Sequence, residues 1–196
     1  MEKRIICDKM INDYDLLTTC DISGFIKEDI RAILLYQSNV KDTDIVLDIN
    51  CGVGEISAEF SKLSKEVISI DSREQSIMLT DKNIKKHGNS DKVRLVNKDE
   101  IEALNELESF DIAILKTNND NYNEIIDLIH KKINSKGRIF ILTNILDFQV
   151  GIVNKLGEFN YNPKITQINL SNGVLLNNGI KIVSDNPITI ISVKKR

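Results

Sequence analysis

The sequence predicts an α/β fold in which helices cover both faces of a mostly parallel, seven-stranded sheet. From residue 27 onward, short apolar runs alternate with segments whose apolar residues recur at helical spacing. The apolar runs are mostly continuous, which is typical of parallel strands that are buried on both faces. The last two runs have no helix between them, and this favours a closing antiparallel pair of strands.

Helices are expected wherever apolar residues recur every three or four positions. In chain order they are 27–37, 55–64, 74–88, 99–107, 122–133 and 146–159. Gly88, at the end of the third helix, is a natural C-terminal cap.

Strands are expected where six or seven mostly apolar residues run together. In chain order they are 44–49, 66–71, 92–97, 110–115, 137–142, 164–170 and 187–193. Lys136 and Gly137 form a turn before the fifth strand. Pro187 suits the first residue of the last strand, where no ladder donor is required. The segment "SNGVLLNNGIKIVSD" (171–185) is expected to be a loop.

Composition and charge narrow the class of protein. The chain has 196 residues, of which 41% are hydrophobic and 28% are charged, as in an ordinary globular domain. Its net charge of −3 gives no support for a nucleic-acid partner. No apolar run approaches the roughly 20 residues that span a bilayer, and the N-terminus lacks a signal-peptide core. We therefore expect no membrane segment.

The cysteines and histidines give no sign of a metal site. Cys7, Cys20 and Cys51 form no CxxC pair, and an odd number of cysteines without metal spacing predicts reduced thiols and a cytoplasmic location. His87 and His130 lie in polar, helical surroundings, where a solvated surface histidine is the usual outcome.

A glycine-rich turn follows the first long apolar strand. The sequence "DINCGVGE" (48–55) runs from this strand directly into the turn. In a parallel sheet, ligands bind at the carboxyl ends of the strands, and glycines there let the backbone approach the ligand and reach positive φ. Gly52 and Gly54 meet this need. Asn50 stands where such a motif usually has glycine, and asparagine is one of the few other residues that tolerate the left-handed region. A purely structural turn is the alternative.

Three carboxylates stand in order around this turn. Asp71 ends the second strand, about 20 residues after the glycines, where an acidic residue commonly holds ribose hydroxyls. Asp99 follows the third strand and can reach an adenine amino group, although a strand-end aspartate is often only a helix N-cap. Asp48 precedes the turn, where it can orient the loop or face a sulfonium. Together they predict an S-adenosyl-L-methionine site, in which Cys51 packs within the loop and is not a nucleophile.

Five parallel strands followed by an antiparallel pair outline the Rossmann-like class I methyltransferase fold. We expect one domain over residues 1–196, with an N-terminal extension (1–26), a cofactor-binding half (27–145) and a substrate-side part (146–196). Substrate and methyl donor usually meet at the loop after the fourth strand, which reads "KTNN" (116–119). Base-modifying amino-methyltransferases generally carry an Asn/Asp-Pro-Pro-aromatic motif there, and this loop lacks it.

Several segments are similar to those of one methyltransferase family. "KEDIRAILL" resembles the family's "KEEVRA" helix, "DIVLDINCGVGEIS" resembles "DVVVDVGCGSGGMT", and the terminal "DNPITIISVKKR" resembles "NPITII" endings. The glycine loop is generic to methyltransferases, whereas the first and last segments are specific. From about Lys27 to its end, the chain resembles the CbiT family, the cobalt-precorrin C15-methyltransferases (decarboxylating) of cobalamin biosynthesis.

The resemblance implies an enzyme that transfers a methyl group from S-adenosyl-L-methionine to C15 of a cobalt-precorrin, a small tetrapyrrole, with loss of carbon dioxide from a ring acetate. It also implies a homo-oligomer, often a tetramer. The cofactor-binding residues that it implies are Asp48, Cys51, Gly52, Gly54, Asp71 and Asp99, with Asn50 in place of a glycine.

The substrate side departs from the family pattern. Lys116 and Thr117 stand in place of Gly-Gly after the fourth strand, and Lys98 stands in place of the glycine of a "GDA" segment. Lys116 is a candidate catalytic residue, which can direct its ammonium at a precorrin carboxylate or fill the substrate pocket. Asp147 takes the place of a family glutamate near the active-site mouth, and a carboxylate at a helix N-terminus is the structural alternative.

Two other functions stay open at the level of the sequence. Since the substrate loops are altered, the chain can be a methyltransferase for another small acceptor. It can also be a cofactor-binding subunit that has lost catalysis. Cofactor binding separates this subunit from the enzymes, and precorrin turnover separates the two enzymes from each other.

Overall fold

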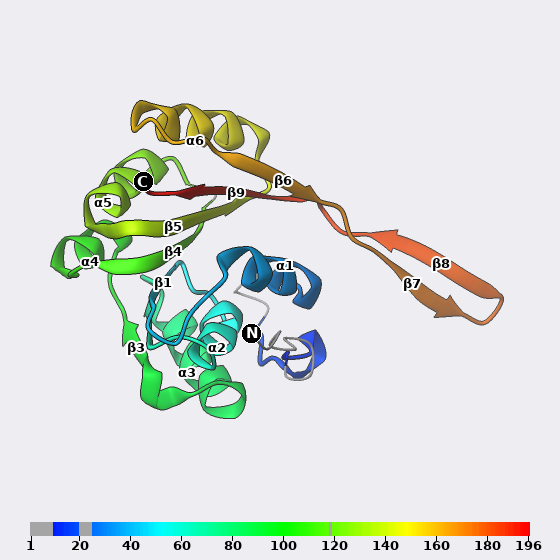
Figure 1. Cartoon of the computed structure of the whole chain (residues 1–196). Helices are drawn as coiled ribbons and strands as arrows, with labels where there is room; N and C mark the ends of the chain where they lie inside the picture. The colour runs from blue at the N-terminus through cyan, green and yellow to red at the C-terminus, as the bar shows by residue number, and fades with distance from the viewer. Residues whose placement is uncertain (1–9, 20–24, 118) are drawn as a thin grey trace, which may run out of the picture.

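A seven-stranded sheet forms the centre of the molecule, with the strand order β3-β2-β1-β4-β5-β9-β6 (Figure 1). The computed structural model describes residues 10–19, 25–117 and 119–196, so Cys7 and Cys20 lie outside the described residues. The strands of this sheet are β1 (Ile45–Ile49), β2 (Glu66–Ile70), β3 (Val93–Val96), β4 (Phe110–Lys116), β5 (Ile133–Thr143), β6 (Lys164–Ile168) and β9 (Ile188–Lys194).

The helices alternate with the strands as expected. The α-helices are α1 (Glu28–Ser38), α2 (Glu55–Ser61), α3 (Glu74–His87), α4 (Glu100–Glu106), α5 (Tyr122–Lys132) and α6 (Leu146–Glu158). Two short 3-10 helices, η2 (Asp13–Asp15) and η3 (Ser90–Lys92), complete the helical elements that the described residues form. The third α-helix ends at the predicted position, with Gly88 as its C-cap residue.

The expected strand directions are confirmed. Strands β1 to β5 pair in parallel, and β9 lies between β5 and β6 and runs antiparallel to both. The carboxyl ends of β1, β2, β4 and β5 therefore meet at one edge of the sheet. The positions of the glycine turn after β1 and of Asp71 after β2 follow from this arrangement.

Apolar clusters lie on both faces of the sheet, as continuous apolar strands predict. Leu47 packs in one cluster with side chains of α4, α5 and α6, while the adjacent Val46 packs in the other with side chains of α1 and α2. The helix α3 packs against α2 and β3. Among the described residues, no helix is long and apolar enough to cross a membrane.

The segment 171–185 is not a loop, so the sequence-based expectation was wrong. It forms an antiparallel hairpin of β7 (Ser171–Leu176) and β8 (Gly179–Ser184), which projects away from the main sheet (Figure 1). Asn177 and Asn178 form its turn, between two apolar runs. Two short apolar runs separated by an Asn/Gly turn predict a hairpin. This signal was missed because the runs do not show the alternation of a strand with one buried face.

The strand β5 also begins earlier than expected. It starts at Ile133, where the helix α5 was expected to continue, and its pairing with β4 shifts register between Phe110 and Ile112. Lys136 has a positive φ of 65° within this strand. The turn predicted at Lys136 is therefore a local irregularity of β5 and not the point where the strand begins.

The described part of the N-terminal extension packs against α2 and α3. The backbone N–H of Ile11 donates to Glu59 of α2, and Leu17 exchanges hydrogen bonds with Asn83 of α3. The buried Arg31 guanidinium donates to the carbonyls of Ile11 and Ile26. The backbone N–H of Ile26 donates to Glu55 Oε1, which places Ile26 beside the glycine turn.

Candidate active site

A cavity of about 740 Å³ opens at the carboxyl ends of the parallel strands, within the usual size range of ligand pockets. Its wall is built from the glycine turn, the ends of β4 and β5, the segment before α1 and the chain on either side of the hairpin. The predicted site residues in this wall are Asn50, Gly52 and Lys116. A hollow of about 810 Å³, lined in part by Arg138 and Asp44, lies elsewhere and contains none of the predicted site residues.

The glycine turn has the backbone that a close approach requires. Asn50, Gly52 and Gly54 all have positive φ, at 62°, 64° and 83°. Asparagine therefore does take the left-handed conformation here, and its side-chain amide donates to the Lys116 carbonyl at 3.0 Å. A side chain at Gly54 would come within 2.6–2.9 Å of Thr80 on α3, so this glycine is needed for packing.

Asp71 lies at the end of β2 and is fully buried. Its carboxylate accepts the Gly52 N–H at 3.0 Å and two hydrogen bonds from the Arg73 guanidinium, at 2.9 and 3.0 Å. Burial alone would raise the pKa of Asp71, but these hydrogen bonds outweigh it and hold the pKa below its ordinary value. The residue is therefore a carboxylate, attached to the turn on one side and to a half-exposed arginine on the other.

Asp48 and Cys51 are buried beneath the turn. The Ser57 hydroxyl donates to Asp48 Oδ2 at 2.6 Å, while Oδ1 has no partner within the described part of the chain. Burial raises the pKa of the Asp48 carboxyl, and Lys116 opposes this rise. Burial also raises the pKa of the Cys51 thiol, which lies 3.4 Å from the Thr80 hydroxyl. Cys51 is thus a neutral packing residue, in agreement with the sequence-based interpretation.

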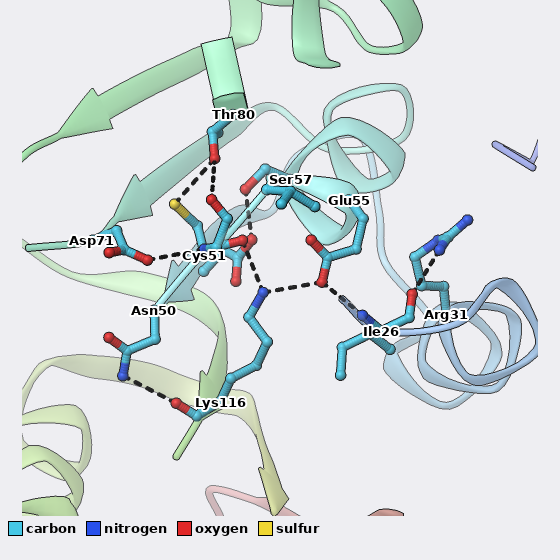
Figure 2. Close-up of polar contacts among 12 residues, drawn as sticks. Ile26, Arg31, Asn50, Cys51, Glu55, Ser57, Asp71, Thr80 and Lys116 are labelled. Atoms are coloured by element: carbon cyan, nitrogen blue, oxygen red, sulfur yellow. Dashed lines mark hydrogen bonds and ion pairs between the residues drawn. The ribbon is translucent and has the colours of Figure 1, made fainter. Parts of the chain in front are cut away.

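Lys116 extends from the end of β4 to the glycine turn (Figure 2). Its ammonium donates to the Cys51 carbonyl at 2.8 Å and to Glu55 Oε1 at 3.1 Å. Burial would lower the pKa of Lys116, but the nearby Glu55 and Asp48 carboxylates outweigh it and raise the pKa to about 12. The ammonium is therefore charged at neutral pH, and it contacts the glycine turn.

Asp99 and Asp147 do not line the cavity. Asp99 is exposed and caps α4, where its Oδ1 accepts the N–H groups of Ile101 and Glu102. Asp147 is exposed in the first turn of α6. Their proposed roles at adenine and at the active-site mouth stay predictions.

Sequence reasoning missed five charged residues of the cavity wall: Lys27, Glu55, Arg73, Glu100 and Asp185. Burial raises the pKa of Glu100, and the nearby Asn50 side chain opposes this rise. Glu55 and Asp185 each carry a buried oxygen without a partner among the described residues. Glu55 follows the last glycine of the turn directly, and this adjacency was the available signal. No such signal marked Asp185, which the fold brings from a distant segment.

These features fit S-adenosyl-L-methionine. Gly52 leaves one face of the turn bare, since the nearest atom to a side chain built there is Lys116 Nζ, at 3.5 Å. Asp71 supplies a carboxylate next to this face, as ribose hydroxyls require. Glu55, in the cavity wall, supplies a buried carboxylate oxygen that can face an ammonium, whereas Asp48 does not line the cavity. Among the described residues, no cluster of three or more His, Cys, Asp or Glu side chains could hold a metal ion.

The chain is similar in sequence and in fold to known methyltransferases. A family model described as RNA cap guanine-N2 methyltransferase matches residues 43–149. A probable cobalt-precorrin-6B C15-methyltransferase (decarboxylating) from Methanobrevibacter smithii is 42% identical over 95% of this chain and 100% of its own length. One from Methanothermobacter thermautotrophicus is 27% identical over 93% of this chain and 95% of its own. The crystal structure of a precorrin-8W decarboxylase from Methanobacterium thermoautotrophicum superposes with a TM-score of 0.90 at 27% identity, covering 94% of this chain and 99% of that one.

Proposed function

Since the chain belongs to the family of the cobalt-precorrin-6B C15-methyltransferases (decarboxylating), we propose that the 740 Å³ cavity holds both the methyl donor and the precorrin. The enzyme methylates C15 of a cobalt-precorrin and removes carbon dioxide from a ring acetate in cobalamin biosynthesis. The observation that carries this function is the 42% identity over 95% of the chain. That match includes the C-terminal part, which supplies one wall of the cavity through Ile168, Leu170 and residues 185–188.

The family model named for RNA caps covers less of the chain. Its match ends at residue 149, so it spans mainly the cofactor-binding half, which methyltransferases with different acceptors share. The loop after β4 lacks the Pro-Pro-aromatic motif of base-modifying enzymes, and the net charge is −3. Both observations favour a small acceptor over RNA.

The methyl donor fits along the carboxyl edge of the sheet. When bound, S-adenosyl-L-methionine supplies a methyl group on a sulfonium. Asp71 would hold the ribose hydroxyls and Gly52 would let the turn approach the ligand, because its exposed face carries no side chain. The Arg73 guanidinium donates to the same carboxylate. When the ribose binds, Asp71 therefore accepts from both groups, or the Arg73 side chain moves away from it. The chain thereby aligns donor and acceptor, which is the main contribution that a protein makes to such a transfer.

The precorrin fits on the other side of the cavity. Leu142, Ile168, Leu170 and Ile188 form an apolar wall there. Loss of carbon dioxide is favoured when a carboxylate is removed from water, and an apolar wall provides this environment. Lys27 and Arg73 line the same cavity and can receive other carboxylates of the precorrin. The division into a cofactor-binding half (27–145) and a substrate-side part (146–196) is part of this proposal.

A homo-oligomer is also part of the proposal, and the apolar hairpin supports it. Six hairpin side chains are exposed although they are apolar: Val174, Leu175, Leu176, Ile180, Ile182 and Val183. Large exposed apolar surfaces of this kind usually mark an interface. A second copy of the chain would cover the hairpin, in accordance with the tetramer that the family resemblance implies. The free thiol of Cys51 is compatible with a reducing, cytoplasmic environment.

Calorimetric titration with S-adenosyl-L-methionine, followed by anaerobic incubation with cobalt-precorrin-6B and a labelled methyl donor, tests the function. Mass analysis is expected to show one labelled methyl group gained and carbon dioxide lost. Methylation without loss of carbon dioxide would restrict the activity to methyl transfer. Absence of cofactor binding at millimolar concentration would support a non-catalytic subunit. Capped RNA in a parallel incubation is expected to remain unlabelled, and its labelling would overturn the choice of acceptor.

A further inference from the structure

Lys116 and Glu55 form a buried ion pair beside the glycine turn (Figure 2). The Lys116 side chain is 15% exposed and the Glu55 side chain is fully buried. Both residues lie in the cavity wall. The resemblance described above implies glycine at both positions, so this chain has two opposite charges where glycines would leave open space.

The order of groups along the sheet edge indicates which part of the methyl donor comes next to Lys116. Asp71 follows β2, the glycine turn follows β1, and Lys116 ends β4. The strands β2, β1 and β4 are neighbours in that order. With the ribose at Asp71, the chain that leaves the ribose crosses the turn toward β4. The Lys116 ammonium lies 3.5 Å from the point where a Gly52 side chain would begin, so the methionine end meets it there.

The ion pair has hydrogen-bonding capacity left over. An ammonium has three protons, and Lys116 donates to two acceptors, Cys51 O and Glu55 Oε1. Glu55 Oε2 is buried and has no partner among the residues that the structure describes. A buried carboxylate oxygen left without a donor is costly, which favours a ligand that supplies one. A ligand with one ammonium and one carboxylate would match both open positions.

We propose that Lys116 binds the carboxylate, and Glu55 the ammonium, of the methionine end of S-adenosyl-L-methionine. This inference rests on the proposed function, which puts the methyl donor in this cavity. It makes Lys116 a binding residue for the methyl donor and not for the precorrin. The backbone N–H of Ile26 also donates to Glu55 Oε1 at 3.0 Å, so the same contact joins the ligand to the segment before α1.

A purely structural ion pair is the competing explanation. Buried pairs often contribute little net stability because desolvation offsets their attraction, yet loss of one partner destabilises the fold. A fall in stability of a Lys116 variant therefore does not distinguish the two explanations. Only the dependence of binding on the ligand's own carboxylate does so.

The test is a binding cycle between Lys116→Met and the ligand carboxylate. S-adenosyl-L-methionine and its decarboxylated form, which lacks only that carboxylate, are titrated calorimetrically into wild type and variant. Wild type is expected to bind the decarboxylated ligand about tenfold to a hundredfold more weakly. Lys116→Met is expected to bind both ligands within about threefold of each other, because it has no partner for the carboxylate. Glu55→Gln is expected to weaken both ligands by the same factor, because both keep the ammonium.

Two controls keep the result interpretable. Lys65→Met removes the same charge at an exposed site and is expected to leave the wild-type preference intact. The double variant Lys116→Met/Glu55→Gln leaves no unpaired charge, and it is used if the single variant fails to fold. Wild type that binds both ligands equally would overturn the inference and leave the function standing, as would a Lys116→Met variant that keeps the full preference. Wild type that binds neither ligand would instead contradict the proposed function.

Discussion

The glycine-turn region and the β7–β8 hairpin differ in how their side chains are satisfied. In the turn region, Asp71 and Lys116 are charged groups with several partners each, held in a buried network. In the hairpin, every residue of both strands is exposed, and Leu175 and Ile180 expose 81% and 68% of their surfaces. The turn region thus buries charged groups, although protein interiors are usually apolar. The hairpin exposes apolar groups, although protein surfaces usually carry charged ones.

This difference shows which part of the molecule is complete within one chain. The turn region has few open hydrogen-bonding positions in its described part, and one of them, Glu55 Oε2, belongs to a residue of the cavity wall. The hairpin leaves both of its faces open. Leu175 and Ile180 pair in register on one face, while Val174 and Val183 lie on the other. Apolar side chains on both faces of a two-stranded hairpin call for covering on both sides, which a second copy of the chain can provide.

The largest effect is expected from charges on the hairpin. Leu175→Glu/Ile180→Glu removes two large apolar side chains from the proposed interface, each with a burial free energy of about 1.5–3 kcal/mol. The oligomer is expected to dissociate in analytical ultracentrifugation, while circular dichroism of the dissociated chain stays that of wild type. Asn177→Glu, which adds a charge at the hairpin turn, is the matched control. An unchanged sedimentation coefficient would place the interface elsewhere, and a wild-type monomer would remove the homo-oligomer from the proposal.

A smaller effect, at the turn region, is expected from Gly54→Ala. The added Cβ would lie 2.8 Å from the Thr80 Cα, which is backbone, and the φ of 83° is unfavourable for alanine. Overpacking and left-handed strain together cost about 3 kcal/mol of the free energy of unfolding. Urea denaturation measures this loss. Gly157→Ala is the control, because its Cβ position in the helix α6 is open space, and it is expected to be neutral or slightly stabilising. Equal stability of both variants would mean that the turn and Thr80 move apart to accept the added Cβ at little cost in free energy.

An effect of about 1 kcal/mol is expected from the charge of Asp71, since half-exposed Arg73 is screened by solvent. The folded-state pKa of Asp71 is held below its unfolded value. Its ionisation therefore stabilises the fold fully above the unfolded pKa of about 3.9, and this contribution is lost as the pH falls through the folded pKa. Asp71→Asn is expected to be less stable than wild type at neutral pH, with the difference shrinking in acid. Urea denaturation at several pH values measures this difference, and one that stays constant with pH would show that the carboxylate charge does not stabilise the turn.

The sequence predicted the two regions with unequal success, and the reason is physical. Buried strands have continuous apolar runs, so the seven-stranded sheet and its site edge followed from local pattern, as did the left-handed turn. Every residue of the hairpin strands is exposed in the single chain, so their apolar residues follow no inside–outside pattern that the sequence could show. The partners of Lys116 depend on how β4 lies against the turn, and no local pattern holds this information. Asp99 caps α4, the structural role that its strand-end position also allowed, and its contact with adenine stays a prediction.

The smallest effect is expected from Asn50→Gly, at the residue that makes this glycine turn unusual. Asn50→Gly removes the hydrogen bond from the side-chain amide to the Lys116 carbonyl, which contributes about 1 kcal/mol. It also relieves the cost of a left-handed side chain, which is of similar size and opposite sign. The two terms nearly cancel, so the free energy of unfolding is expected to change by less than about 1 kcal/mol. Asn50→Val loses the same hydrogen bond and adds a β-branched side chain at φ 62°, so a loss of about 2–3 kcal/mol is expected. Urea denaturation of both variants separates the terms. A large loss in Asn50→Gly would mean that the link to β4, and not the left-handed backbone, is what asparagine contributes to the turn.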